Sequence, residues 1–61
     1  MLEYVKTILV KVSFDIKLFE KELKKALKSL VKEEILELKN WCFKKFGSSH
    51  EQVLQKCFLA Y

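Results

Sequence analysis

Apolar residues at helical spacing run through the middle of this 61-residue chain and constrain its fold more than any other feature. From residue 16 they recur at three- and four-residue steps, the pattern of one buried helical face: Ile16, Phe19, Leu23, Ala26, Leu27 and Leu30. A second stripe is displaced by roughly 110° when each residue turns by about 100°; it consists of Val31, Ile35, Leu38, Cys42 and Phe46. One straight helix cannot direct both stripes at one core. We therefore expect two helices with a break between Leu30 and Glu33, and the rival is a single kinked helix over residues 15–46.

Local signals define the ends of these two helices. Ser13 or Asp15 is expected to cap the first helix, because short polar side chains accept hydrogen bonds from free backbone N–H groups there. Lys44 and Lys45 suit the last turn of the second helix, where positive charge complements the helix dipole. Gly47 directly after them predicts a left-handed C-terminal cap.

A third helix is expected after this glycine. Ser48 followed by Glu51 has the spacing of a capping box at a helix start. The apolar face of this helix would consist of Val53, Leu54, Cys57, Phe58 and Tyr61. The chain has no internal repeat and no linker, so we expect a single small domain over residues 1–61.

The segment Tyr4–Val12 (YVKTILVKV) predicts a β-strand, because it is rich in β-branched residues. A single strand in a monomer has no partner for its backbone hydrogen bonds. We therefore expect it to pair with the same strand of a second copy in an antiparallel two-fold ribbon; the alternative is an extended tail packed on the helices. The expected fold is mainly α, with one N-terminal strand and three helices (β-α-α-α) joined into a homodimer.

The charge and the hydropathy of the chain limit which partners and locations we expect. The chain has 12 basic residues, all of them lysine, against 8 acidic residues, which gives a net charge of +4. Arginine, which grips phosphates and guanine edges with a planar fork, is absent. The charge therefore points only weakly to an anionic partner such as nucleic acid. No uncharged apolar run exceeds the five residues 57–61, too few to cross a bilayer, so we expect a cytoplasmic protein with no membrane-spanning segment, and a membrane partner is not favoured.

The second helix has an unusually wide apolar arc. Besides its main stripe it carries Leu36, Trp41 and Phe43, which widens the arc to about 200° against the roughly 100° of an ordinary surface helix. Aromatic residues are enriched where protein partners dock. We therefore predict a partner-binding surface at these three residues; the alternative is that the aromatic side chains fill the core of a small domain.

Lysines repeat along the opposite face of the first helix. They are Lys17, Lys21, Lys24, Lys28 and Lys32. Such a row can bind nucleic-acid phosphates or anionic lipid, or it can simply be the solvated face of a helix whose other face is buried.

Catalytic or metal chemistry is not expected. Cys42, His50 and Cys57 are the only thiol or imidazole groups, and their spacing matches no zinc-ligand pattern. Both cysteines fall on apolar helix faces, where a free thiol behaves as a small apolar group. A disulfide between them is an alternative, although the two positions are not level across the turn at Gly47. We expect no enzyme activity and no cofactor, and we place His50 at the surface.

The predicted strand and residues 47–54 (GSSHEQVL) together resemble ribbon-helix-helix DNA-binding proteins. In that family a two-stranded ribbon from a dimer enters the major groove. The resemblance implies that Thr7, Leu9 and Lys11 face the bases, and that backbone amides near Ser48 hold a phosphate.

Two main functions follow from these patterns, and a third, weaker one is a membrane-surface protein that uses the lysines from Lys17 to Lys32. The leading expectation is a small non-enzymatic protein-interaction module that self-associates through the N-terminal strand and the apolar flank of the second helix. The alternative is a dimeric DNA-binding regulator whose contacts would come from Thr7, Leu9, Lys11, Lys17, Lys21, Lys24 and Lys28.

Overall fold

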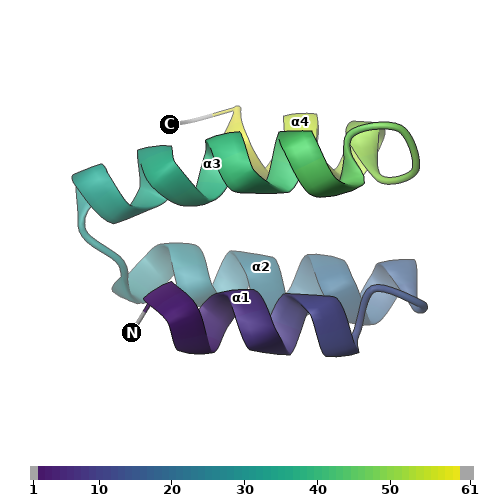
Figure 1. Cartoon of the computed structure of the whole chain (residues 1–61), viewed down its shortest axis with the longest axis horizontal. Helices are drawn as coiled ribbons and strands as arrows, with labels where there is room; N and C mark the ends of the chain where they lie inside the picture. The colour runs from purple at the N-terminus through teal and green to yellow at the C-terminus, as the bar shows by residue number, and fades with distance from the viewer. Residues whose placement is uncertain (1, 60–61) are drawn as a thin grey trace.

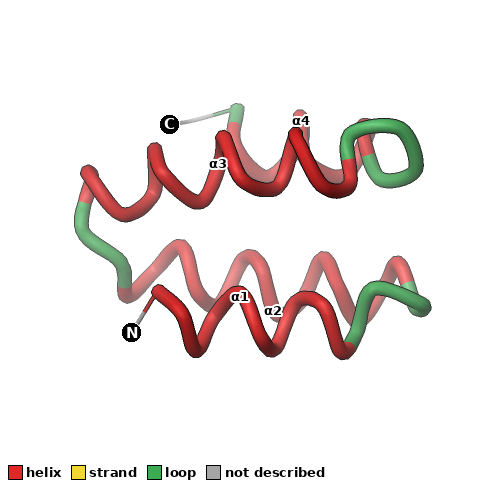
Figure 2. Tube along the Cα trace, viewed as in Figure 1, coloured by secondary structure: helices red, strands yellow, loops and turns green. Residues whose placement is uncertain are grey.

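Four α-helices make up the structure, a computed structural model that describes residues 2–59 of the chain. They are α1 (Leu2–Lys11), α2 (Ile16–Ser29), α3 (Lys32–Phe46) and α4 (Glu51–Phe58). Figure 1 shows them as two layers, with α1 and α2 in one and α3 and α4 in the other. Short connections join consecutive helices, and the α1–α2 and α3–α4 turns lie at the same end of the bundle (Figure 2).

Each helix lies beside two others. α1 packs against α2 and α3, and α4 packs against the same two helices. α2 and α3 therefore occupy opposite corners of the bundle, and the short link between them crosses from one layer to the other (Figure 1).

The predicted N-terminal strand is wrong, because residues 2–11 form α1, and no strand occurs among the residues that the structure describes. Val5 and Leu9 lie one helical turn apart and are 7% and 0% exposed, and Leu2 and Val12 pack at the edge of the same core. Packing of an apolar face provides most of the stability of a protein helix and outweighs the weak strand preference of β-branched residues. The predicted ribbon between two copies depended on an unpaired strand edge. Because this segment is a helix, the prediction of a strand-paired homodimer is wrong as well.

The predicted break between the two central helices is confirmed. Leu30 and Val31 have extended backbone conformations between α2 and α3, so a single kinked helix is excluded. Asp15 is the N-cap of α2, and its carboxylate accepts hydrogen bonds from the N–H groups of Lys17 (3.1 Å) and Leu18 (3.3 Å). The Ser13 hydroxyl instead donates to the carbonyl oxygen of Val10.

The turn between α3 and α4 differs from the prediction. Gly47 has φ −56° and ψ −34°, which is a right-handed conformation and not the predicted left-handed cap. The N–H groups of Ser49 and His50 both donate to the carbonyl oxygen of Phe46, at 3.1 and 2.8 Å, so the chain continues in a tight right-handed turn. α4 consequently begins at Glu51 with His50 at its N-cap, and the predicted capping box at Ser48 does not form.

The core draws on all four helices. Its buried residues are Val5, Leu9, Phe19, Leu23, Leu27, Leu30, Ile35, Leu38, Cys42, Phe46, Leu54, Cys57 and Phe58. Most members of the two predicted stripes and of the predicted face of α4 are among them, whereas Ile16 and Val31 are exposed. Tyr61, which was predicted to belong to the last face, lies outside the described residues. None of the described helices is long and apolar enough to cross a membrane.

His50 joins the two turns at one end of the bundle. Its Nε2 lies 2.9 Å from the carbonyl oxygen of Ser13, and its Nδ1 lies 2.7 Å from Oγ of Ser49. A carbonyl oxygen can only accept, so Nε2–H donates to Ser13, and in the neutral ring Nδ1 accepts from the Ser49 hydroxyl. The imidazole also packs edge-on against Phe19, with ring centres 4.7 Å apart. His50 is therefore half-buried, and the predicted surface position misses its contacts with Ser13 and Phe19.

We expect Gly47→Ala to lower the free energy of unfolding by about 1–3 kcal/mol, the range typical of overpacked sites. A Cβ at this position would collide with the carbonyl oxygen of Phe43, a backbone atom that cannot move aside alone. Urea unfolding measures the loss. Ser48→Ala, at an exposed neighbouring position, serves as the control, and an equal loss in both variants would contradict the steric explanation.

We expect His50→Ala to destabilise the fold more than His50→Phe does. Phenylalanine keeps the ring against Phe19 and loses the hydrogen bonds to Ser13 and Ser49, of which the part-buried bond to Ser13 contributes about 1 kcal/mol. Alanine loses these hydrogen bonds and the ring contact as well. Thermal unfolding of the two variants, with the exposed Gln52→Ala as control, tests this order. Equal stability of the two His50 variants would show that the ring contact adds nothing.

Candidate functional site

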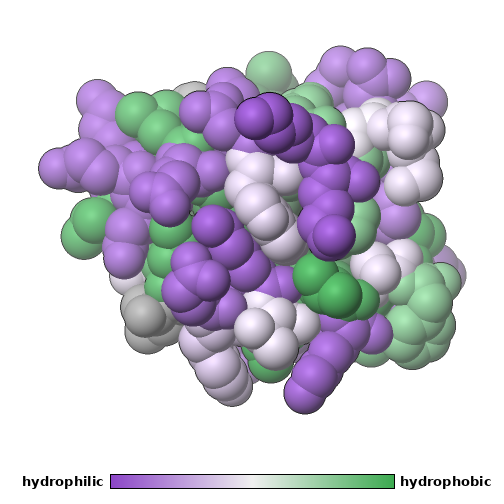
Figure 3. All heavy atoms as spheres, viewed as in Figure 1, coloured by the Kyte–Doolittle hydropathy of each residue, from purple (hydrophilic) through white to green (hydrophobic). Residues whose placement is uncertain are grey.

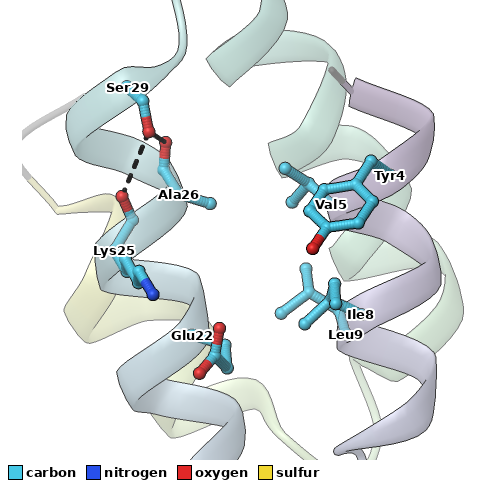
Figure 4. A pocket seen from close by; sticks show the side chains of 8 residues that line it. All are labelled: Tyr4, Val5, Ile8, Leu9, Glu22, Lys25, Ala26 and Ser29. Atoms are coloured by element: carbon cyan, nitrogen blue, oxygen red, sulfur yellow. Dashed lines mark hydrogen bonds between the residues drawn. The ribbon is translucent and has the colours of Figure 1, made fainter.

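A groove of about 210 Å³ lies between α1 and α2. Each helix contributes four side chains, and Figure 4 shows the two sets facing each other across the groove with α3 and α4 behind them. The lining residues are Tyr4, Val5, Ile8 and Leu9 from α1, and Glu22, Lys25, Ala26 and Ser29 from α2.

Two small side chains on α2 explain why the groove exists. Ala26 is directed at α1 but is too short to fill the space next to Val5 and Leu9. Ser29 turns its hydroxyl back to its own helix, with Oγ at 3.4 Å from the carbonyl oxygens of Lys25 and Ala26. The α1 side of the groove is apolar, since Val5, Ile8 and Leu9 line it. Tyr4, which also lines this side, is 67% exposed.

The outer surface of α2 beside the groove is strongly basic. Four exposed lysines at four- and three-residue steps lie on this face: Lys17, Lys21, Lys25 and Lys28. We call these four residues the lysine row. Within residues 2–59 none of them lies within 4 Å of a carboxylate.

Lys24 differs from the lysine row because it is paired. Its Nζ lies 2.9 Å from the carboxylate of Glu20, which also contacts Lys56 of α4 at 3.3 Å. Hydrogen bonds from both lysines lower the pKa of Glu20, and the hydrogen bond to Glu20 raises the pKa of Lys24. This cluster links α2 to α4 and leaves Lys24 less available than its neighbours.

The three predicted partner-binding residues of α3 do not form one surface. Trp41 faces α1, whose Lys6 ammonium group lies 5.6 Å from the centre of the Trp41 ring. The ring also packs edge-on against Phe46 of its own helix, with 5.6 Å between ring centres. Phe43 packs against Phe58 of α4. Only Leu36 is substantially exposed, at 46%. The wide apolar arc of α3 is thus largely covered by α1 on one side and α4 on the other, and partner binding by these residues stays a prediction.

The residues predicted for nucleic-acid binding are also dispersed. Thr7 and Lys11 are exposed on α1, and the Thr7 hydroxyl donates to the carbonyl oxygen of Glu3. Leu9 is 0% exposed and has no surface to offer a base. The predicted lysines, at positions 17, 21, 24 and 28, are exposed on α2, a separate element. No ribbon brings these side chains together, and nucleic-acid binding stays a prediction.

Both cysteines are free and buried. Burial is the main cause that raises the pKa of the Cys42 thiol to about 12, and burial also raises the pKa of Cys57. Both thiols are therefore protonated near neutral pH. In the described part of the chain, no three metal-binding side chains gather at one point.

Sequence reasoning missed the groove residues Tyr4, Ile8 and Ala26. Ala26 was assigned to the buried stripe of its helix because its spacing fits, and the pattern does not reveal that a neighbouring helix leaves it partly uncovered. The available signal was its size, since a single alanine among larger apolar residues leaves space opposite it.

Hydrophilic residues dominate the face of the molecule shown in Figure 3, and apolar atoms appear between them as separate patches. The described large apolar side chains with the greatest exposure are Tyr4, Phe14, Val31 and Leu59. Comparison of the chain with protein-family models, with curated proteins and with solved structures found no match.

We expect the stability of the fold to fall as the pH rises from 9 to 12 in a manner that depends on Cys42. The thiol ionises above pH 9 in the unfolded chain but only near pH 12 in the folded one, so its contribution is complete below pH 9 and is lost above it. Urea unfolding at several pH values measures the slope. Cys42→Ala should show a shallower decline, and equal slopes would contradict the assignment.

Proposed function

We propose that the chain is a small, non-enzymatic protein-interaction module whose binding site is the groove between α1 and α2. The observation that supports this proposal most is the apolar floor of the groove, which is open to the surface while the other apolar helix faces pack largely against one another.

The size of the groove favours a side chain of another protein over a free small molecule. Pockets for drug-sized ligands have volumes of about 300–1,000 Å³, whereas a cavity of about 150 Å³ already holds a benzene ring. A volume of about 210 Å³ suits one aromatic or two aliphatic side chains that project from a partner. The exposed Tyr4 ring supplies the kind of aromatic contact that is enriched in protein interfaces.

Leu36 on α3 provides a second contact surface for the same function. It is the exposed member of the flank that the sequence singled out for self-association. We place the module in the cytoplasm, where a reducing environment keeps thiols such as Cys42 and Cys57 free. DNA binding through a two-stranded ribbon is not proposed, because the residues of that ribbon form α1.

Photocrosslinking in the native cell tests the groove as a protein-binding site. A photoreactive phenylalanine analogue replaces Tyr4, and we expect discrete adducts with a protein of defined mass. The change Ala26→Leu in the same chain fills the groove floor and should remove these adducts, while circular dichroism checks that the helices remain. The same analogue at position 36 tests the flank of α3, and because Leu36 does not line the groove, any adducts formed there should survive Ala26→Leu. Adducts from position 4 that survive Ala26→Leu, or none at all, would contradict the proposal.

A further inference from the structure

We infer that the groove between α1 and α2 binds an acidic amphipathic helix of another protein. This inference rests on the proposed function and adds the chemistry of the partner. It follows from three features: the length of the groove, the charge of the adjoining helix face and the net charge of the chain.

The length of the groove fits a helix that inserts two apolar side chains. The α2 wall extends from Glu22 to Ser29, which corresponds to about 10 Å at 1.5 Å per residue. Two apolar residues at positions i and i+4 of a partner helix are about 6 Å apart and can both enter this space. Docking an amphipathic helix by such anchors is a recurrent mode of protein recognition.

The lysine row supplies the electrostatic part of the site. Its four residues repeat at four- and three-residue steps, so they form one stripe about 16 Å long beside the groove. Lys25 belongs both to the stripe and to the groove lining. Because these ammonium groups have no carboxylate partner within residues 2–59, acidic residues flanking the apolar anchors of a partner would meet free positive charge.

A second copy of the chain is a less suitable occupant. Each copy carries a net charge of +4, and the outer face of α2 would bring a lysine row to any contact made through the same surface. Among residues 2–59, Glu22 is the single acid that lines the groove. This carboxylate should repel an acidic partner, so removing its charge should increase the affinity, whereas removing the lysine charges should decrease it.

Selection from a peptide library tests the inference on the intact chain. The probes are displayed helical peptides of about 16 residues, with an apolar pair at i and i+4 and random flanking residues. We expect Asp and Glu to be enriched over Lys and Arg on one flank. For a selected peptide, the double variant Lys25→Glu/Lys28→Glu should raise the dissociation constant about tenfold at low salt. Glu22→Gln should lower the dissociation constant.

Two controls are needed. The first separates the effect of charge at the site from the effect of the overall charge of the chain, and the second tests whether binding requires the open groove. Lys44→Glu/Lys45→Glu makes the same charge change on α3, also near a helix end, and should change the affinity less than about twofold. Ala26→Leu should abolish binding without loss of helicity.

The outcomes distinguish failure of the inference from failure of the proposed function. If neutral or basic peptides are enriched and their binding is lost in Ala26→Leu, the inference of an acidic partner would be wrong. The groove would still be a protein-binding site, as the proposed function states. Binding that Ala26→Leu leaves intact, or no enrichment above that variant, would overturn both. Self-association in light scattering that Ala26→Leu removes would make a second copy the occupant, and duplex DNA that competes equally for the lysine row would make it a nucleic-acid surface.

Discussion

The packing of α1 against α2 and α3 is the contact that determines both the candidate site and the cover over α3. Val5 and Leu9 enter the common core, and the outer edge of the same contact forms the apolar side of the groove. α1 also covers the side of α3 that carries Trp41, while α4 covers the side that carries Phe43. An apolar arc too wide for an exposed helix thus becomes ordinary once a helix lies on each side of it. The shape of the candidate site and the modest exposure of α3 have the same origin.

The three helices after residue 15 could be predicted from the sequence, because helical periodicity is a strong local signal, but the predicted fold class with an N-terminal strand was wrong. The phase change near Leu30 located the break between α2 and α3 without any glycine or proline. The first segment was misassigned because its β-branched residues were weighed above its spacing, although Leu2, Val5, Leu9 and Val12 follow three- and four-residue steps. Strand preference depends on context, and here the neighbouring helices decided the outcome.

The candidate site was less predictable, because it depends on how helices lie relative to one another. The sequence placed Ala26 on a buried face correctly, but only the position of α1 shows that its small side chain leaves a groove. Leu36, Trp41 and Phe43 were grouped by their common helix, yet α1 and α4 divide them between two sides. His50 was similarly judged by its place near a helix start, whereas its role comes from Ser13, distant in sequence. Contacts between distant segments have no periodic signature.

The groove and the stability of α1 are physically coupled. α1 contributes two buried residues, against three from α2, four from α3 and three from α4, so it has the fewest anchors in the core. A chain of this size buries only about 60% of its unfolded surface and has little stability to spare. Helices with few buried contacts open most readily. The groove exists only while α1 is docked, because Val5 and Leu9 are part of its lining. An occupant of the groove, as proposed above, would therefore bind the docked state selectively and shift the equilibrium toward it, which would link its binding to completion of the four-helix core.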